Sequence, residues 1–265
     1  MVINKPIVGV AVLIFVLAAG GVYYLRSRNA PLPAAPTAPA ASAPAATEPG
    51  VEHPLPAAAG NAGSATPLPE LADSDVPLRD ALAQLSSADA VKDFLMPQDV
   101  IRKIVVTVDN LPRQKVAVEK RPTTPIAGSF VARGDELHST LDSRNFERYK
   151  PMVAVISKID AKQLAAVYIH FYPLFQQSYQ NLGYPNGYFN DRLVEVIDNL
   201  LAAPEPKEPI DLIRPNVMYT FADPTLEARS AGQKLLIRMG PENSKALKAK
   251  LTELKAAVTA GTLKH

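Results

Sequence analysis

Residues 160–189 read DAKQLAAVYIHFYPLFQQSYQNLGYPNGYF. The stretch holds eight of the chain's aromatic residues, which are nine tyrosines, eight phenylalanines and no tryptophan in all. Large rings dominate the energetics of cores and interfaces, so we expect the folded part of the chain to be built around this segment. Its apolar side chains recur at spacings of three and four, the pattern of one helix face: Leu164, Tyr168, Phe171, Phe175, Tyr179 and Leu182.

The same stretch carries start and stop signals for a helix. Asp160 is placed as an N-cap, with Gln163 as its capping-box partner. Pro173 lies inside the helical pattern, where it lacks a backbone donor and its ring crowds the preceding turn. We therefore expect a kink or break that leaves the carbonyl of Ile169 without its helical partner. Gly183 is a typical stop residue, and the Tyr-Pro-Asn-Gly sequence after it predicts a turn.

Residues 75–265 are predicted to form one mainly α-helical domain of about eight helices. Residues 97–111 hold a β-branched run that also suits a strand, but their length without a turn signal favours a helix. A β-hairpin is predicted near 129–141, and one short strand at 217–221. The predicted helices lie at 75–85, 88–95, 97–111, 151–159, 161–182, 191–203, 224–239 and 241–258.

The N-terminal segment, residues 1–28, is predicted to be a transmembrane anchor. Residues 7–25 carry no charge and are long enough to cover most of a hydrocarbon core about 30 Å thick. The lipid bilayer is therefore an expected partner. A cleaved signal peptide is the alternative, although the apolar run exceeds the usual signal core and ends in Tyr-Tyr-Leu-Arg. Basic residues flank both ends, so the positive-inside rule does not decide the orientation.

Residues 29–74 are predicted to be a disordered linker. Residues 30–70 contain ten prolines, fourteen alanines and no aromatic residue, and such a segment buries too little apolar surface to offset its ordering entropy. Two interpretations of this tether stay open. Its length either sets how far the domain reaches from the membrane, or has little effect on function. A long tether after one anchor suits a single-pass protein of the bacterial inner membrane whose globular domain lies in the periplasm.

Composition excludes several classes of function. Charged residues make up 20% of the chain and the net charge is +2, so no strong field of one sign points to nucleic acid. The absence of cysteine excludes disulfides, thiolate nucleophiles and cysteine-based metal sites. The chain has no GxSxG, phosphate-binding glycine loop, HExxH or paired histidines. We expect no cofactor, no metal site and no catalytic residues, and the oligomeric state stays open.

A charged group in the C-terminal half is the first candidate site. Glu227, Lys234 and Arg238 are spaced by seven and four residues, which places them on one face of the predicted helix 224–239. With Arg148, Asp160 and Asp223 they would either line a cleft for an anionic ligand or form salt bridges that hold this helix to its neighbours. Breaking such a network would destabilise the protein even without a chemical role.

Two weaker candidates lie in and after the aromatic helix. His170 lies close to Pro173 and could transfer protons, although a structural histidine is the commoner case. The next helix, for which Asn190 is the predicted cap, carries three acidic residues on its outer face: Asp191, Glu195 and Asp198. They could hold a cation or act as a carboxylate pair, but this spacing is more typical of a solvated edge.

Scattered short motifs resemble one bacterial family. The set comprises Asn145-Phe146, Arg148-Tyr149, Pro173-Leu174-Phe175, Tyr179, Leu182-Gly183-Tyr184-Pro185, Tyr219, Ala222-Asp223-Pro224, Leu226-Glu227, Gly232-Gln233-Lys234 and Arg238-Met239-Gly240. Together they resemble a family of single-pass membrane proteins known as domain of unknown function 3014, over residues 77–258. The family has no assigned activity. The resemblance therefore implies the domain layout and a bacterial envelope setting, and it transfers no catalytic residue.

We expect a non-enzymatic module that binds or scaffolds an envelope partner, either a protein or peptidoglycan. The alternative is a hydrolase that acts on envelope glycan or peptide through carboxylates such as Glu227 or Asp223. An enzyme should show a concave pocket with a carboxylate of raised pKa, and a scaffold should show closed salt bridges and an exposed apolar patch. The candidate ligand- or partner-binding residues are Arg148, Tyr149, His170, Tyr179, Tyr184, Asp223, Glu227, Lys234 and Arg238.

Overall fold

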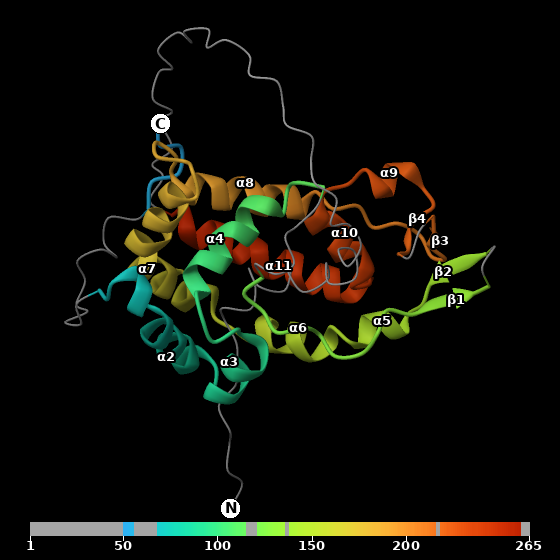
Figure 1. The fold of residues 1–265 in the computed structure, drawn as a ribbon, viewed down its shortest axis with the longest axis horizontal. Coiled ribbons are helices and arrows are strands. Elements are labelled where there is room, and N and C mark those ends of the chain that lie inside the picture. The colour runs from blue at the N-terminus through green and yellow to red at the C-terminus, as the bar shows by residue number, and fades with distance from the viewer. Residues whose placement is uncertain (1–49, 56–67, 115–120, 136–137, 216–217, 261–265) are drawn as a thin grey trace, which may run out of the picture.

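The computed structural model describes residues 50–55, 68–114, 121–135, 138–215 and 218–260 (Figure 1). The predicted anchor and the first part of the predicted linker lie outside the described residues. Among the helices that are described, none is long and apolar enough to cross a lipid bilayer.

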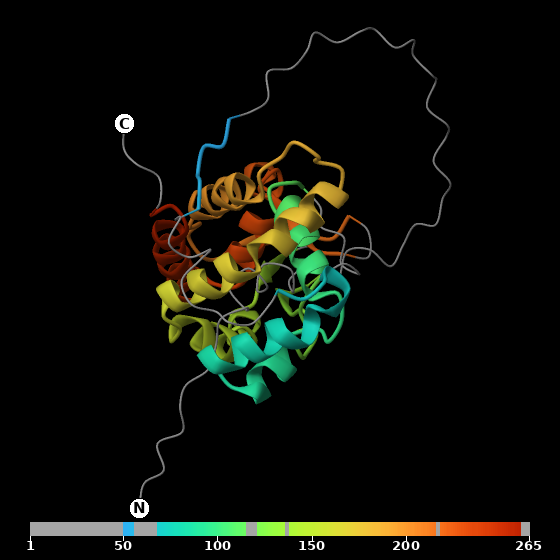
Figure 2. The ribbon, with the colours of Figure 1, turned by 90° about the vertical axis from the view of Figure 1, so that its left-hand side faces the viewer.

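Helices from both halves of the domain form its centre. Helix α7, Ala161–Asn181, packs against α4, Val100–Asn110, and against α11, Pro241–Val258. Helix α8, Phe189–Leu201, contacts α4 and α11, and α6, Lys150–Ser157, packs on α11 (Figures 1 and 2). Their apolar stripes meet in one core because each stripe follows the helical period. The helix predicted at 97–111, rather than a strand, is confirmed by α4.

The aromatic stretch fills this core. Tyr168, Phe171, Phe175 and Tyr179 on α7 are buried, together with Phe189 on α8. The rings of Phe175 and Phe189 stack with their centroids 5.8 Å apart. Complete burial of a side chain such as that of Phe189 contributes about 1.5–3 kcal/mol relative to exposure. The expectation that the fold is built around this segment is confirmed, and these five rings leave no open aromatic groove.

The ends of α7 match the start and stop signals in the sequence, whereas no break occurs at Pro173 in its middle. Asp160 Oδ1 accepts the backbone N–H groups of Lys162 and Gln163, each at 2.9 Å. Gly183, with φ of 115°, follows the helix in the left-handed region that glycine favours. Of the predicted kink or break, the break is wrong, since α7 runs without interruption through Pro173, and the kink stays a prediction. Pro173 lies on the exposed side of the helix, where water can satisfy a carbonyl freed one turn earlier.

Two short helices pack on the outside of this core. Helix α2, Asp75–Leu85, packs against α7 and against α3, Ala88–Phe94. A 3-10 turn, Leu71–Asp73, precedes α2, and its Leu71 is buried in the core. The last residues of the predicted linker therefore belong to the folded domain.

A small sheet lies at one end of the molecule (Figure 1). Its four antiparallel strands are β1, Ala132–Gly134, β2, Ser139–Leu141, β3, Asp211–Ile213, and β4, Thr220–Phe221, paired in that order. The hairpin predicted near 129–141 is confirmed by the β1–β2 pair. A second apolar cluster lies under the sheet and is formed by Leu141, Ile210, Leu212, Phe221 and Ile237.

The sheet corrects the expectation of one isolated strand after the hairpin. Strand β3 lies in a proline- and glutamate-rich connector and pairs with β2, Ser139 opposite Leu212. Only Thr220–Phe221 of the strand predicted at 217–221 pairs, and residues 216–217 lie outside the described residues. Strands this short are set by pairing with distant segments, which local periodicity does not reveal.

The described residues contain ten α-helices where about eight were predicted. Helix α5, Arg144–Glu147, was not predicted. The helix predicted at 224–239 is two helices, α9, Pro224–Glu227, and α10, Ala231–Arg238. The chain breaks between them because Ser230 starts α10 as an N-cap, its hydroxyl accepting the N–H of Gln233 at 3.2 Å. The prediction of a mainly α-helical domain with a small β-element is confirmed.

Candidate functional site

The predicted charged group forms a closed cluster between α9 and α10. Lys234 Nζ lies 2.8 Å from Glu227 Oε1 and also donates to the Glu227 carbonyl at 3.0 Å. Glu227 Oε2 accepts the N–H of Phe221 at 3.0 Å. The charges meet across the break at Ser230 rather than along one helix face. We call Glu227, Lys234 and Arg238 the α9–α10 charge cluster.

The remaining polar groups of this region support the same closed structure. The guanidinium carbon of Arg238 lies 4.7 Å from the centroid of the Phe221 ring, and burial lowers the pKa of Arg238 while Glu227 opposes that shift. Tyr149 is buried, and burial raises the pKa of its hydroxyl. Asp223 caps α9, and hydrogen bonds from Thr225 hold its pKa below the ordinary value. Asp223 is thus a carboxylate at neutral pH and cannot serve as a general acid.

Arg148 and His170 make local contacts. The Arg148 guanidinium donates to the carbonyls of Ala127 at 3.0 Å and Gly128 at 2.8 Å, and so holds the loop before β1. The imidazole of His170 is half-buried and meets the Phe171 ring edge-on, with centroids 4.8 Å apart. The structure brings neither residue to the α9–α10 charge cluster by a hydrogen bond or ion pair within the described part of the chain.

Tyr179 and Tyr184 belong to a partly buried network at the other end of α7. Their rings stack with centroids 4.6 Å apart. The Tyr184 hydroxyl lies 3.3 Å from Asp109 Oδ2, and it accepts a hydrogen bond from Arg113 at 3.0 Å. Arg192 on α8 contacts the same carboxylate at 3.2 Å. The Asp109 side chain is only 5% exposed, so this network joins α4 to α8 and leaves no free charge for a ligand.

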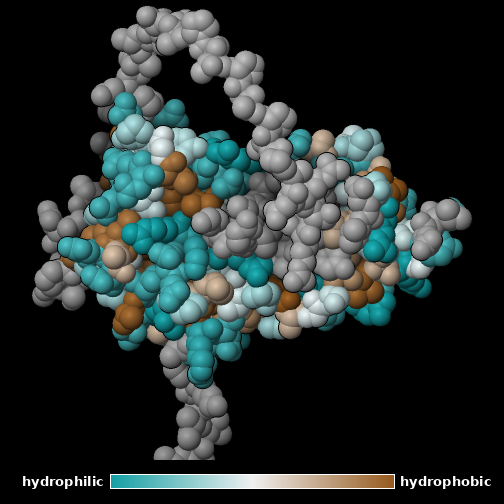
Figure 3. Space-filling model, viewed as in Figure 1, coloured by the Kyte–Doolittle hydropathy of each residue, from teal (hydrophilic) through white to brown (hydrophobic). Residues whose placement is uncertain are grey.

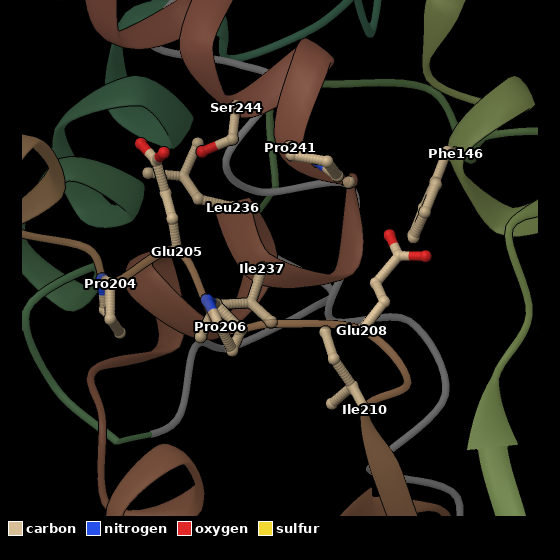
Figure 4. Close-up of a pocket in the computed structure, with 11 residues that line it drawn as sticks. Phe146, Pro204, Glu205, Pro206, Glu208, Ile210, Leu236, Ile237, Pro241 and Ser244 are labelled. Atoms are coloured by element: carbon tan, nitrogen blue, oxygen red, sulfur yellow. The ribbon is translucent and has the colours of Figure 1, made fainter.

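A small pocket lies between α10, α11 and the connector that follows α8 (Figure 4). Its volume is about 20 Å³, which is room for about one water molecule and far below the ~300–1,000 Å³ of typical small-molecule sites. Glu205 at its edge pairs with Lys248 at 3.0 Å, and this pairing lowers the pKa of Glu205. None of the nine predicted site residues lines this pocket. The lining residues are Phe146, Pro204, Glu205, Pro206, Glu208, Ile210, Leu236, Ile237, Gly240, Pro241 and Ser244.

The described residues do not form a broad exposed apolar patch either. Their four exposed large hydrophobic side chains lie on separate elements. On the face drawn in Figure 3, hydrophobic residues occur in small groups separated by hydrophilic ones. The apolar patch expected of a scaffold is therefore absent from this part of the chain. The four residues are Val51, Val76, Leu182 and Ile213.

A different site lies at the start of α8, where the domain holds a segment of the predicted linker. Residues 50–55, which we call the strap, lie beside the N-terminal end of α8 (Figures 1 and 2). Asp191 accepts two consecutive backbone N–H groups of the strap, from Glu52 at 3.1 Å and from His53 at 2.6 Å. The Tyr188 hydroxyl accepts the N–H of Leu55 at 3.3 Å.

Asn190 completes this set of contacts. Its Nδ2 donates to the carbonyl of His53 at 2.8 Å, so both backbone groups of His53 are hydrogen-bonded to adjacent residues of α8. We call Tyr188, Asn190 and Asp191 the strap site. Its hydrogen bonds to the strap go to main-chain groups, which every peptide carries apart from the missing N–H of proline.

The core holds the strap site in place. Asn190 is fully buried, its Oδ1 accepts from the Tyr168 hydroxyl at 3.2 Å, and its Nδ2 also donates to the carbonyl of Val258 at 3.3 Å. Burial raises the pKa of Tyr168 and of Tyr172, so both phenols stay protonated. Asp191 lies in the first turn of α8, where the helix dipole favours a negative charge.

Within the domain, residues 100–255 match the family described as Protein of unknown function (DUF3014). The chain belongs to this family. The DUF3014 match runs from α4 through most of α11 and includes the strap site, while the strap, α2 and α3 lie before it. Neither a curated protein nor a solved structure matches the chain.

The motifs that carry the DUF3014 resemblance largely have structural roles. Asn145 is buried and donates to the carbonyls of Val131 at 2.6 Å and Asp142 at 2.8 Å. Gly240 has φ of 85°, and a Cβ atom there would lie 2.5 Å from the Phe146 ring. A side chain at Gly232 would clash with Leu200. At these three positions, therefore, the motif residues serve hydrogen bonding and close packing within the domain.

Sequence reasoning did not identify the strap site. Asn190 was predicted as the cap of α8, but the helix begins at Phe189 and Asn190 points into its core contacts instead. Asp191 was interpreted as part of a solvated edge. One signal was available, because Val51-Glu52-His53-Pro54-Leu55 departs from the proline and alanine composition around it. Its contact with a helix 138 residues further along is not visible in any local pattern.

Proposed function

We propose that the chain is a non-enzymatic binding module of the bacterial envelope, anchored in the inner membrane through residues 7–25. The mainly helical domain lies in the periplasm and binds a protein partner through the strap site. Of the two partner classes considered, protein and peptidoglycan, a protein fits better, because the strap site contacts main-chain amide groups.

One observation carries this proposal, the recognition of a peptide segment that bends at Glu52 and His53 by the side chains of α8 and Tyr188. Three acceptor oxygens, two from Asp191 and one from Tyr188, meet three N–H groups of the strap, and Asn190 donates to one of its carbonyls. Hydrogen bonds to peptide main-chain groups are a recurring way in which binding domains obtain affinity. The site is rigid because Asn190 is fixed by Tyr168 and Val258.

The carboxylates of the hydrolase alternative have other partners. Asp223 caps α9, and Glu227 pairs with Lys234. A general acid needs a raised pKa and a pocket that admits substrate, whereas neither carboxylate lines the pocket in Figure 4, which has room for about one water molecule. The observations therefore favour binding, and we do not propose the hydrolase.

The membrane anchor and the periplasmic location are supported by sequence. Residues 7–25 are uncharged, and the alanine- and proline-rich segment after them suits a domain held away from the bilayer. A topology reporter fused after His265 tests the orientation. We expect activity from a reporter that works in the periplasm, and activity only from a cytoplasmic reporter would overturn this part of the proposal.

Site-specific photo-cross-linking in cells tests the binding function. A photoreactive residue at Glu195, which is exposed one turn after Asp191, should cross-link the full-length chain to an envelope protein. We expect the cross-link to disappear in Asp191→Ala and to persist in Asp198→Asn, a matched exposed position on α8. Absence of any Asp191-dependent cross-link, together with cleavage of glycan strands or peptides by the purified chain, would contradict the proposal.

A further inference from the structure

We propose that the strap site docks a peptide segment of the partner protein in the bent conformation of the strap, and that the strap is a built-in competitor for it. This inference rests on the proposed binding function. It adds the chemical class of the ligand and the way in which access to the site is controlled.

The hydrogen-bonding pattern defines the ligand. The strap offers N–H groups at Glu52, His53 and Leu55, and each of them is bound. Pro54 lies between them and has no N–H to satisfy. Leu55 is half-buried and packs against the core, whereas Pro54 is exposed. A fitting peptide therefore bends at its first two positions, as the strap does at Glu52 and His53. It has free N–H groups at its first, second and fourth positions, tolerates proline at the third and carries an apolar side chain at the fourth.

The strap fits its site imperfectly at one position. His53 Nδ1 is buried and has no hydrogen-bond partner among the described residues. A buried polar atom without a partner weakens binding, so a peptide with an apolar residue of similar size at this position should bind more tightly. The strap is thus a ligand that a better peptide can displace.

The other side chains of the strap add little contact. Val51 and Glu52 are exposed, so the strap is held mainly by the hydrogen bonds of its backbone and by Leu55. Its covalent attachment to the domain offsets this weakness, since a contact within one chain acts at an effective concentration on the order of millimolar. A partner peptide must exceed that competition, which makes the site selective for segments that bind better than the strap.

Peptide binding to the full-length chain tests the inference. The probe is a fluorescent peptide of residues 49–56, measured by anisotropy against the native chain and against a variant with residues 51–55 replaced by glycine and serine. We expect the strap-replaced chain to bind the probe at least about tenfold more tightly than the native chain, because the competing strap is gone. A probe with His53→Leu should bind about tenfold more tightly than the native peptide.

Two variants in the strap-replaced chain test where the peptide binds. Asp191→Ala should abolish binding, and Asp198→Asn on the outer face of α8 should leave it unchanged. Equal binding by the native and strap-replaced chains, or binding that survives Asp191→Ala, would overturn the inference. An Asp191-dependent dimer in sedimentation would also overturn it, because it would assign the site to the strap of a second copy.

A second measurement uses the native chain, so that it does not depend on the strap-replaced variant folding. Excess His53→Leu peptide should increase hydrogen exchange at the amides of Glu52 and His53 about tenfold or more, and unchanged exchange would contradict displacement. The two proposals fail separately. Cross-links at Glu195 that depend on Asp191 without any peptide binding would overturn only the peptide inference, whereas loss of both results would remove the binding function as well.

Discussion

The α9–α10 charge cluster and the strap site use similar side chains in opposite ways. In the cluster, Glu227 meets Lys234 and a backbone N–H of the adjacent strand, all within a short stretch of chain. At the strap site, Asp191 directs both carboxylate oxygens to a segment 138 and 139 residues away. The cluster is hydrogen-bonded within a short stretch of chain, whereas the Asp191 carboxylate receives its hydrogen bonds from a segment that is distant in the sequence.

This difference separates polar groups whose partners lie close by in the domain from polar groups that are available to bind another segment, which we call receptive. Charged side chains at regular helical spacing indicate an ordered face, but they give no information on whether their partners lie inside the domain. A receptive group is one whose hydrogen-bonding capacity is left unmet by its own domain. Asp191 meets that criterion and Glu227 does not, although Glu227 looked the stronger candidate in the sequence.

The distinction between the two regions is weakest at Asn190, because its side chain hydrogen-bonds both to the core and to the strap. Asn190→Ala should lower the free energy of unfolding by about 2–4 kcal/mol, because the Tyr168 hydroxyl and the Val258 carbonyl lose a partner and a small cavity forms. Urea unfolding followed by circular dichroism measures the change. Asn181→Ala, an exposed position at the end of α7, is the matched control. A loss below about 1 kcal/mol would show that the strap site is not anchored in the core.

Lys234→Met tests whether the charge cluster is structural. The Lys234 side chain is 11% exposed and that of Glu227 is 33% exposed. Removing one partner of such a pair should lower the free energy of unfolding by about 1–3 kcal/mol, less than for a fully buried pair because water reaches Glu227. Lys162→Met on the exposed face of α7 is the control. Unchanged stability would mean that the cluster does not hold α9 on α10.

Asp191→Asn should act on the strap and leave the fold intact. The substitution replaces a charge-assisted acceptor pair with one neutral acceptor, so hydrogen exchange at the Glu52 and His53 amides should rise about tenfold. The free energy of unfolding should change by less than about 1 kcal/mol, since Asp191 is only half-buried. Asp198→Asn is again the matched control. Exchange rates that stay at the native level would contradict the role of Asp191.

The smallest effect on stability at neutral pH is expected at Asp142, which precedes α5 near the sheet and pairs with Arg144 close to it in the sequence. Hydrogen bonds from Arg144 lower the pKa of Asp142 from 3.8 to about 2. Because the folded pKa is depressed, the contribution to stability is present above pH 3.8 and is lost as pH falls through about 2. An NMR titration of the carboxyl carbon should give a midpoint near 2 that moves toward 3.8 in Arg144→Met.

The helical part of the fold was predictable because its signals are local. The Asp160 cap, the aromatic stripe of α7 and the Gly183 stop lie within one segment, and each was confirmed. The break before α10 also had a local signal, since Ser230 and Gln233 have capping-box spacing. The uninterrupted helix through Pro173 was not predicted, because exposure of that side chain depends on how α7 packs.

The sheet and the strap site were not predictable from local patterns. Strand β3 is three residues long in a proline-rich connector, and it exists because β2 and β4 lie on either side of it. The strap is identified only by its contacts with α8, which lies about 138 residues further along the chain. The candidate residues suggested by charge and aromatic content make contacts within the domain, because such groups are the ones that a folding core recruits.

Attachment of the strap also decides where a mechanical load enters the domain. A pull on the chain before residue 50 reaches α8 first, through Asp191 and Asn190. Asn190 transmits that load to α7 through Tyr168 and to α11 through Val258, so the three longest described helices share it. Helices α2 and α3 are nearer to the N-terminus in sequence, yet they bear tension only after the strap detaches.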